Sequence, residues 1–556
     1  MAVTVNINEG DVDVTTLTSL EVTRRINRIP EAVLHFYDGH DEETDEITYA
    51  LSNLEHFAPG AEVSISITRT DDEGAEDEQP LFIGKVFRHA VEAEGDRKGL
   101  RVELKDIAID MTGGRRCVVH REQSDAQIIT ALIGDAGLEA GTIPDTKPVH
   151  AEILQYLCSD WDFMLMRAEI QGLLVSVDDG TISLYAAGVA ADGALTHEYV
   201  FPHDDIYELE LEFDGSQQNA AYEVAVWNPK DKKRADPVAA SADPTPTQGQ
   251  QSGSEVGEAL GLAAYTLEAG LALDPDEATA WVNARQARSR MAMIRGRMRV
   301  KGVAPVTLLD QLSLDGVGAR FDGTALITGI TQRYDDDEWS TEFELGLESE
   351  IFARTPDIVE PAAAGLLPPI AGLQLGVVKD YKKDELGEHR IQVVLPMVPD
   401  SYGPIWARLA TPDAGPARGF LSWPEPGDEV VVAFLNQDPR QAVILGSTFS
   451  SVNAPPALVG PPPEDKAKAK RIMTTLAGLT ILFDEERPGL TLQTKAGNKI
   501  DLDDTSGSEA IVITDKTGNS ITMNKDGVTI KCEGKLTISA SGDVAVTGSS
   551  VDFGPS

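Results

Sequence analysis

The chain has 556 residues, too many for one hydrophobic core, so several domains are expected. It carries 91 acidic against 47 basic residues, a formal net charge of −44, which argues against nucleic acid or an anionic membrane surface as a docking partner. The three cysteines, Cys117, Cys158 and Cys532, form no CxxC pair, so neither a disulfide framework nor a zinc cluster is expected.

The N-terminus and the hydropathy pattern bear on where the protein is made. Met1 to Val5 shows no charged region followed by an apolar one, and no apolar run of the sequence is long enough to span a bilayer. We therefore expect a protein that is made in the cytosol without a signal peptide. Much of the acidic charge falls in three runs typical of solvated loops, Asp41 to Glu46, Asp71 to Glu78 and Asp335 to Glu338.

Residues 1–112 predict a β-barrel or sandwich. Apolar and polar residues alternate in several short segments, such as Val63 to Ile67 and Leu100 to Leu104, and turn-rich stretches separate them.

Residues 113–203 predict an α/β unit inserted between β domains. Ser124 is a suitable N-cap for an amphipathic helix over Ala126–Ala136, and a second helix is predicted from His150 to Ile170. A hairpin is predicted around residues 179–180, where the sequence reads Asp-Gly.

Residues 204–354 return to a β pattern and predict a second barrel. Residues 229–255 are rich in Pro, Ser, Gln and Gly and predict a flexible loop. A helix is predicted after Asp274, with acidic residues in its first turn. Its later part is expected to carry five arginines, Arg285, Arg288, Arg290, Arg295 and Arg297.

The last third of the chain divides into modules and proline-rich linkers. Residues 355–372 and 450–471 predict linkers, and residues 373–449 predict a compact β module between them. Residues 472–556 are a succession of short alternating strands that are separated by glycine turns.

This terminal ladder predicts a structure that needs more than one chain. Alternation puts the apolar residues on one face of each strand, and each strand is too short to bury that face alone. The expected core between chains consists of Ile500, Leu502, Ile521, Met523, Val528, Ile530, Ile538, Val544 and Val546. Cys532 shares the face of Val528 and Ile530 and is expected to be a small core residue.

No residue pattern predicts catalysis or a bound cofactor. His197 and His203 are close in sequence, but no third ligand accompanies them, so no metal site within one chain is expected. The sequence leaves open whether an ion binds on a threefold axis, because a site there would need only one ligand from each chain. The acidic residues around the second linker, Glu464, Asp465, Asp484, Glu485 and Glu486, are expected to be solvated, and Trp406 and Trp423 are expected to pack in the core of the β module.

The β module carries a specific sequence pattern. Gly387 to Val393, Trp423 to Leu435 and Asp438 to Ser447 form a strand–turn series that resembles the OB-fold module of VgrG-type (valine-glycine repeat) spike proteins and phage tail needle proteins. Ser159 to Phe163 and Phe321 to Thr324 look like the tail-hub part of the same family.

The resemblance implies a mainly β fold. It would comprise two hub β-barrels with an α/β insertion, an OB-fold module and a C-terminal intertwined trimeric β-helix, or β-prism. The function that it implies is the trimeric hub-and-spike of a contractile injection machine, which caps the inner tube and punctures a target envelope. The system could be a type VI secretion system, a contractile phage tail or an extracellular phage-tail-like particle.

The resemblance also implies partners and a location. The partners would be two further copies, the inner tube ring, baseplate proteins and a separate tip protein of the proline-alanine-alanine-arginine (PAAR) type at Val551 and Phe553, with transient contact to the target membrane. The particle would be assembled in the cytoplasm and delivered outward, and the chain would not be an enzyme. The alternative is an acidic β-rich tail fibre or adhesin that binds a glycan or receptor, although Phe553 is the only aromatic residue after Phe483.

Overall fold

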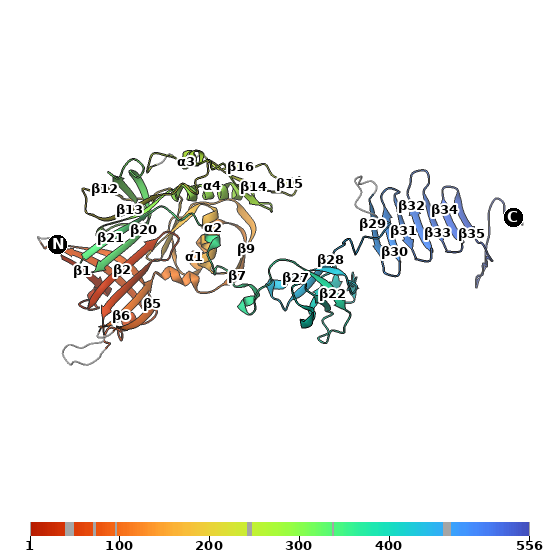
Figure 1. Ribbon diagram of the computed structural model, residues 1–556, viewed down its shortest axis with the longest axis horizontal. Coiled ribbons are helices and arrows are strands. Elements are labelled where there is room, and N and C mark those ends of the chain that lie inside the picture. Colours follow the sequence, from red (N-terminus) through yellow and green to blue (C-terminus); the bar gives the residue numbers. More distant parts are fainter. Residues whose placement is uncertain are drawn as a thin grey trace. The chain divides into compact units, whose positions relative to one another are not determined.

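The computed structural model describes residues 2–38, 49–70, 74–94, 97–241, 247–335, 338–459 and 469–554 (Figure 1). The chain divides into two compact units, Met1–Pro361 and Ala362–Ser556. Several predicted features lie wholly or partly outside the described residues: the acidic run Asp41 to Glu46, parts of the other two acidic runs, part of the 229–255 loop, and much of the 450–471 linker with Glu464 and Asp465.

The first unit is built on one twelve-stranded sheet. Ten strands follow the order β1-β4-β5-β6-β3-β2-β20-β21-β18-β13, while β19 pairs with β20 and β12 pairs with β19. Their bounds are β1 (Ala2–Ile7), β2 (Leu17–Arg25), β3 (Glu31–Tyr37), β4 (Glu62–Thr70), β5 (Glu76–Glu94), β6 (Arg97–Lys105), β12 (Thr196–Val200), β13 (Ile206–Phe213), β18 (Ile294–Lys301), β19 (Gln311–Asp315), β20 (Gly323–Asp335) and β21 (Glu338–Leu345).

The residues of the two predicted barrels contribute the two halves of this one sheet, whose strand order does not close on itself, and each half has its own core. The N-terminal half packs around Phe36, Phe57 and Phe82, and the other half packs around Met298 and Phe343. Antiparallel pairing of β2 with β20 joins the halves. The mainly β fold class is therefore confirmed, while the join between the halves is a long-range pairing that no local pattern signals.

The α/β insertion is present, and its first helix begins as predicted. The hydroxyl of Ser124 caps helix α1 (Asp125–Asp135) by accepting a hydrogen bond from the backbone N–H of Gln127. In return, the side-chain carbonyl of Gln127 accepts a hydrogen bond from the backbone N–H of Ser124. Strands β10 (Leu173–Asp178) and β11 (Thr181–Ala186) form the predicted hairpin, with Asp179 and Gly180 both at positive φ.

The helix predicted from His150 to Ile170 is wrong in its first half. Val149–Cys158 is strand β9, which pairs with β7 (Arg116–Ser124), and only Asp160–Ile170 is helical, as α2. Ser159 decides the boundary, because its hydroxyl accepts a hydrogen bond from the backbone N–H of Asp162 and caps α2. The short strand β8 (Glu139–Ala140) completes this unit beside β11.

Residues 204–354 contain a second small α/β element. Helix α4 (Pro275–Met291) packs against β14 (Tyr222–Asn228), which pairs with β15 (Lys233–Arg234), β16 (Val238–Ala239) and β17 (Tyr265–Ala269). The predicted 229–255 loop therefore contains two short strands, and it runs into helix α3 (Gly253–Leu260). The sequence did not predict these two strands, because a strand of two residues has no detectable periodicity.

Helix α4 starts as predicted and ends earlier than predicted. The side chain of Asp274 accepts a hydrogen bond from the backbone N–H of Asp276 and caps the helix. The helix ends at Met291, so Arg295 and Arg297 lie on strand β18. There they face Glu212 and Glu210 of β13, which gives these arginines cross-strand partners that a helix would not provide.

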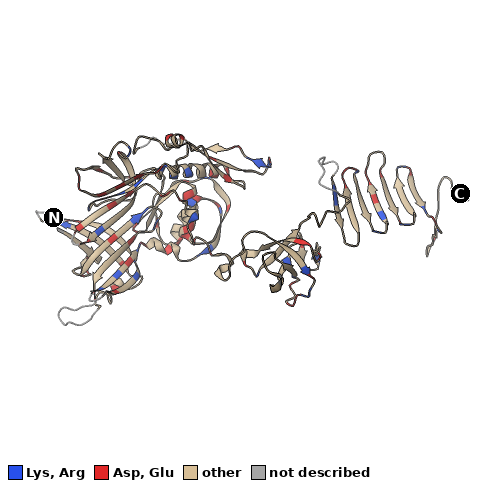
Figure 2. Ribbon diagram, in the orientation of Figure 1, with Lys and Arg blue, Asp and Glu red and all other residues tan. Residues whose placement is uncertain are grey.

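Acidic and basic residues are both present on the strands of this sheet (Figure 2), and several of them form pairs between strands. Three pairs join β13 to β18: Glu208 with Arg299 at 2.5 Å, Glu210 with Arg297 at 3.0 Å, and Glu212 with Arg295 at 3.3 Å. Farther along the sheet, Arg25 of β2 pairs with Glu344 of β21 and Arg333 of β20 pairs with Glu21 of β2.

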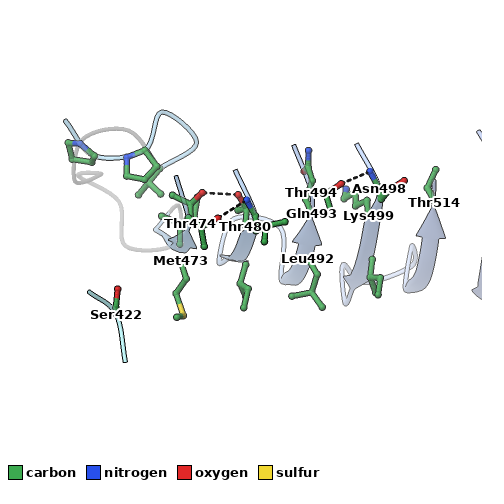
Figure 3. Close-up of a pocket in the computed structure, with 18 of the residues that line it drawn as sticks. Ser422, Met473, Thr474, Thr480, Leu492, Gln493, Thr494, Asn498, Lys499 and Thr514 are labelled. Atoms are coloured by element: carbon green, nitrogen blue, oxygen red, sulfur yellow. Dashed lines mark hydrogen bonds between the residues drawn. The ribbon is translucent and has the colours of Figure 1, made fainter. Parts of the chain in front are cut away.

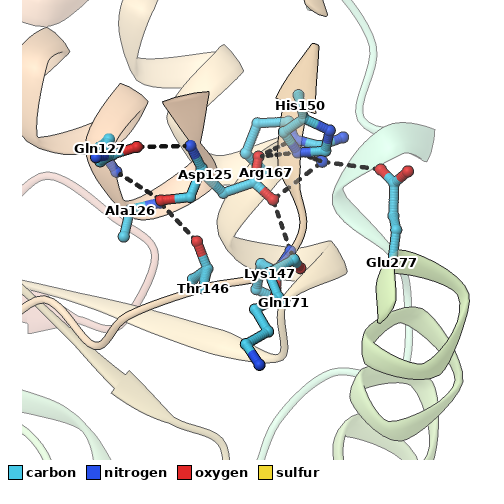
Figure 4. A network of polar contacts seen from close by, with 10 residues as sticks. Asp125, Ala126, Gln127, Thr146, Lys147, His150, Arg167, Gln171 and Glu277 are labelled. Atoms are coloured by element: carbon cyan, nitrogen blue, oxygen red, sulfur yellow. Dashed lines mark hydrogen bonds and ion pairs between the residues drawn. The ribbon is translucent and has the colours of Figure 1, made fainter. Parts of the chain in front are cut away.

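A buried ion cluster ties the insertion to helix α4 (Figure 4). Arg167 of α2 donates two hydrogen bonds to Asp125 of α1, at 2.6 and 3.0 Å, and one to Glu277 of α4 at 2.9 Å. Gln171 also donates to Asp125 at 2.6 Å, and His150 lies 3.2 Å from it. The carboxylate of Asp125 is fully buried, so these contacts replace the water that it loses.

The second unit contains a small closed barrel and the terminal ladder. The barrel strands pair in the order β22-β23-β24-β28-β27, and β27 pairs back with β22. The bounds are β22 (Gln374–Asp380), β23 (Ile391–Val394), β24 (Ile405–Leu409), β27 (Glu429–Phe434) and β28 (Ala442–Ser447), with a hairpin of β25 (Ala414–Gly415) and β26 (Arg418–Gly419). No helix among the described residues of the chain has the length and apolarity that crossing a membrane requires.

Removing one member of the buried ion cluster should destabilise the first unit. Arg167→Met leaves Asp125 buried without its bidentate partner, and we expect a loss of about 3–5 kcal/mol in the free energy of unfolding of this unit. Calorimetry or hydrogen exchange on the full-length chain measures it. The control is Arg121→Met, which breaks an exposed pair with Glu152 and should cost less than about 1 kcal/mol. Equal effects of the two changes would contradict the role of the cluster.

Candidate trimer interface

The terminal ladder is a seven-stranded antiparallel sheet in which every strand pairs with its neighbours in sequence (Figure 1). The strands are β29 (Lys470–Thr474), β30 (Thr480–Asp484), β31 (Gly489–Gln493), β32 (Lys499–Asp503), β33 (Ala510–Thr514), β34 (Ser520–Asn524) and β35 (Gly527–Lys531). The sheet is thus a meander within one chain, and the intertwining of three chains stays a prediction.

Similar hairpin turns recur along one edge of the ladder and fix the register. In one of them the backbone N–H of Thr494 donates to the carbonyl of Asn498, and the N–H of Gly497 donates to the carbonyl of Thr494. Asp515, Gly518 and Asn519 repeat this arrangement two strands later. Both glycines have φ of 97°, a left-handed conformation that a side chain would strain.

One face of the ladder, which we call the apolar face, consists of two rows of side chains. The pairing register places one residue of every strand in each row. The first row is Met473, Ile481, Leu492, Ile500, Ile513, Ile521 and Ile530, and the second is Phe483, Leu490, Leu502, Ile511, Met523 and Val528, preceded by Arg471. Met473 and Leu492 point to the same side of the sheet in Figure 3.

This face is open to solvent in a single chain. Exposed fractions are about 40% in the middle of the ladder, as for Ile511 and Ile513, and rise to 68% for Val528 at its end. Isolated apolar residues on a surface are ordinary, but a continuous patch of this extent marks an interaction site. If an assembly buried the exposed apolar surface of this face, the burial would stabilise it by on the order of 10 kcal/mol per chain.

The head of the apolar face borders a pocket in the second unit (Figure 3). Met473, Leu492 and Ile500 line it together with Ser422 and Phe449 of the preceding module. On the turn side, the hydroxyls of Thr474 and Thr480 lie 3.1 Å apart across the first hairpin. The lining is mainly aliphatic and aromatic, and it continues the apolar face rather than forming a separate site.

The opposite face, which we call the polar face, is organised around Asp501. Arg487 donates two hydrogen bonds to the carboxylate of Asp501, at 2.8 and 2.9 Å, and a third to Asp503. Thr491 donates to Asp501 at 2.5 Å, and the ammonium group of Lys499 lies 3.1 Å away. The guanidinium of Arg487 and these further donors hold the pKa of Asp501 well below its usual range.

The structure places the nine predicted core residues in two groups. Ile500, Leu502, Ile521, Met523, Val528 and Ile530 lie on the apolar face. Ile538, Val544 and Val546 follow β35, in a described segment without strand structure. The strands predicted there are wrong for the single chain, because these apolar runs span three residues and Ser and Gly separate them, so each could form only a few ladder hydrogen bonds.

Sequence reasoning missed seven members of the apolar face. They are Met473, Ile481, Phe483, Leu490, Leu492, Ile511 and Ile513. Ile511 and Ile513 were the hardest of these to find, because Val512 stands between them and makes the run apolar without alternation, and because their strand follows a longer turn without a Gly-Asn pair. Cys532 lies just beyond β35 and is half-buried.

The structure also places the histidine and the tryptophan that the sequence analysis singled out. His197 lies 3.2 Å from Asp310, which also accepts hydrogen bonds from the backbone N–H groups of Leu195 and Thr307. Trp423 is 41% exposed, so the prediction that it packs in the core is wrong. The described residues contain no group of three or more His, Cys, Asp or Glu residues that could hold a metal ion.

Comparison with known families covers most of the chain. Residues 1–336 match the family described as the Alg8 N-terminal domain, residues 374–449 match the type VI secretion system/phage-baseplate injector OB domain, and residues 489–554 match the phage baseplate V C-terminal trimerisation domain. The first match covers more than half of the chain.

Individual relatives are matched over shorter stretches. The actin cross-linking toxin VgrG1 of Vibrio cholerae is 30% identical over 192 residues, which are 33% of this chain and 16% of that protein. The type VI secretion system spike protein VgrG3 of Vibrio cholerae is 33% identical over 108 residues, 19% of this chain and 9% of that protein. Among solved structures, the 43 kDa tail protein of prophage MuSo2 from Shewanella oneidensis is 12% identical with a TM-score of 0.44, covering 62% of this chain and 96% of that one.

The chain belongs to the family of the Alg8 N-terminal domain, and it is a VgrG-type spike protein.

The ion pairs of the polar face should make the ladder sensitive to acid. The folded-state pKa of Asp501 lies below its unfolded value of about 3.9. The ionised Asp501 therefore contributes its full stabilisation at pH values above the unfolded-state pKa, and this stabilisation is lost as pH falls through the folded-state pKa. We expect the thermal midpoint of the ladder, followed by circular dichroism, to stay level between about pH 5 and 8 and to fall below about pH 4.

The matched variant is Asp501→Asn. It should lower the midpoint at neutral pH and flatten the fall in acid, because the asparagine does not titrate. A variant with the same acid slope as the unaltered chain would show that other carboxylates carry the effect.

Proposed function

We propose that this VgrG-type spike protein works as the trimeric hub-and-spike of a contractile injection machine. The observation that supports this most directly is the apolar face, which no element of the chain's own ladder covers. The match of residues 489–554 to a trimerisation domain supports two further copies as the cover.

The dimensions of the ladder fit a threefold prism. Strands of five residues span about 17 Å, and seven strands at a spacing of about 4.8 Å extend for about 29 Å. Three such sheets facing one axis would bring six rows of apolar side chains together, two from each chain. All charged groups of the polar face would then stay on the outside, where Asp501 and Arg487 already satisfy one another.

We assign the rest of the chain to the hub by the same proposal. Residues 1–112 and 204–354 would form two barrels per chain. A trimer would then have six barrels, a number that suits a cap on a sixfold inner tube. Residues 113–203 would lie beside these barrels. The OB module over residues 373–449 would join the hub to the needle, between the linkers 355–372 and 450–471. Baseplate proteins would be the remaining neighbours.

The C-terminal end supports a further proposal about the tip. Phe553 is 87% exposed and Val551 is 47% exposed, so both are available to a partner. We assign this end to a separate PAAR-type tip protein. The spike itself would act mechanically and not catalytically, after assembly in the cytoplasm, and would touch the target membrane only while it is driven outward.

Charge placed on the apolar face should abolish the trimer. Val528→Asp or Ile530→Asp would bury three carboxylates near the axis, at a cost that the remaining contacts cannot offset. SDS-resistant trimers should disappear on gels, while circular dichroism shows a folded hub. Thr529→Asp is the matched control, because Thr529 lies between the two on the same strand and on the polar face. Unaltered trimers in the apolar-face variants would refute the prism.

Removal of the C-terminal end should separate tip binding from trimer formation. A chain truncated after Val546 loses Val551 and Phe553 but keeps all seven strands of the ladder. We expect pull-down of the tip protein to be lost while light scattering still gives a trimer. Retained pull-down would contradict the assignment of these residues to the tip contact.

A further inference from the structure

A short hairpin of the first unit carries a concentration of positive charge. Four of the five residues from 230 to 234 are basic, in a chain where 47 of 556 residues are basic and 91 are acidic. Strand β15, which ends this hairpin, is accordingly blue in Figure 2. The four exposed basic residues, together with Trp227 at the end of β14, are called the basic tip: Lys230, Lys232, Lys233 and Arg234.

Local hydrogen bonds fix the turn that carries these lysines. The side-chain oxygen of Asn228 accepts hydrogen bonds from the backbone N–H groups of Lys230 and Asp231, at 3.0 and 3.2 Å. The amide nitrogen of the same side chain donates to the carboxylate of Asp231 at 2.9 Å. The one acidic residue of the turn is thereby held by Asn228, and the three lysines of the basic tip form no ion pair with any described residue. The turn therefore presents a net positive charge on a defined backbone.

An exposed aromatic side chain lies beside this charge. Trp227 is directly opposite Arg234 in the pairing of β14 with β15, so both side chains lie on the same face of the hairpin. Helix α4 packs on the other face, against Val224 and Val226, and Trp227 remains 39% exposed. Arg234 also pairs with Glu268 of β17 at 2.9 Å. Tryptophan and arginine are the residue types most enriched among those that dominate the affinity of protein interfaces.

We propose that the basic tip binds a short acidic segment of another protein. Carboxylates of that segment would pair with the lysines of the turn, and an apolar side chain of the segment would lie on Trp227. Recognition of acidic motifs by clusters of basic residues is a general mode of peptide binding. The site lies within one chain, so this proposal goes beyond the trimer proposed above and does not depend on it.

The charge of the rest of the chain favours a short segment over a large polyanion. At physiological ionic strength the Debye length is about 8 Å, so a ligand responds mainly to the charges that it touches. A bilayer or a nucleic-acid duplex extends well beyond the basic tip. It would bring its phosphates close to the remaining surface of a chain whose net charge is −44. A peptide of a few residues contacts the tip alone, where the net charge is positive.

Fluorescence anisotropy with the full-length chain tests this site. The probe is a fluorescein-labelled oligoglutamate with one central phenylalanine, and the same peptide with glutamine in place of glutamate is the neutral control. We expect the acidic peptide to bind with a dissociation constant that rises at least about fivefold between about 50 and 300 mM salt, because screening increases over that range. The neutral peptide should bind at least about tenfold more weakly.

Charge reversals locate the binding. Lys232→Glu combined with Lys233→Glu should weaken binding of the acidic peptide at least about tenfold. The matched control is Lys382→Glu combined with Lys383→Glu, which makes the same change of charge in an exposed loop of the OB module, where acidic residues flank the two lysines. It should leave the dissociation constant unchanged. Trp227→Ala should weaken binding at least about threefold while the salt dependence persists, and circular dichroism should show every variant folded.

The proposal is refuted if the unaltered chain shows no salt-dependent binding, or if the tip variants bind the peptide as well as the control variant does. It is also refuted if phosphatidylglycerol vesicles or a DNA duplex bind more tightly than the peptide and lose that binding in the tip variants, because the tip would then serve a phosphate-bearing partner. Light scattering on the same samples reports the trimer separately. A monomeric chain that still binds the peptide would refute the trimer and support the basic tip.

Discussion

The structure of the C-terminal unit depends on one constraint: the ladder has an apolar face that stays exposed in the part of the chain that the structure describes. Each of its strands is five residues long, and the pairing register aligns them so that apolar side chains form two rows. A shift of one residue in any hairpin would turn that strand's apolar side chains to the wrong face. The glycine turns at Gly497 and Gly518 thus matter for assembly as much as for the fold, because they hold the rows in line.

The distribution of charge follows from the same constraint. A trimer would have a formal charge of 3 × (−44) = −132, so contacts between copies must be made where repulsion is least. The apolar face has only Arg471 among its charged positions. Some of the acids elsewhere are paired locally, as Asp501 is with Arg487 and as Glu210 is with Arg297 on the sheet of the first unit. The remaining negative charge is left on surfaces that face solvent or other proteins.

How much of this the sequence could predict depends on the range of the interactions. Local signals were sufficient for the cap of α1 at Ser124, for the hairpin at Asp179 and for the alternation of the ladder, because each involves residues a few positions apart. The sequence predicts helix for strand β9, because its apolar residues fit both periods and the pairing with β7 that decides between them is not local. The join of β2 with β20 spans some three hundred residues and leaves no local trace.

In the candidate trimer interface, too, the sequence predicts local features and misses those that depend on distant residues. Alternation identified Leu502 and Met523 as members of one face, but it also suggested Ile538 and Val546, where the described chain has no partner strand. In a meander the strands lie across the long axis of the ladder, and the backbone hydrogen bonds between them run along it. Axial stiffness would then come from the backbone, which every sequence shares, while the apolar side chains would close the proposed prism. A needle of the proposed kind would require alternation and turns but no particular reactive residue, which fits a sequence whose main feature here is a repeated pattern.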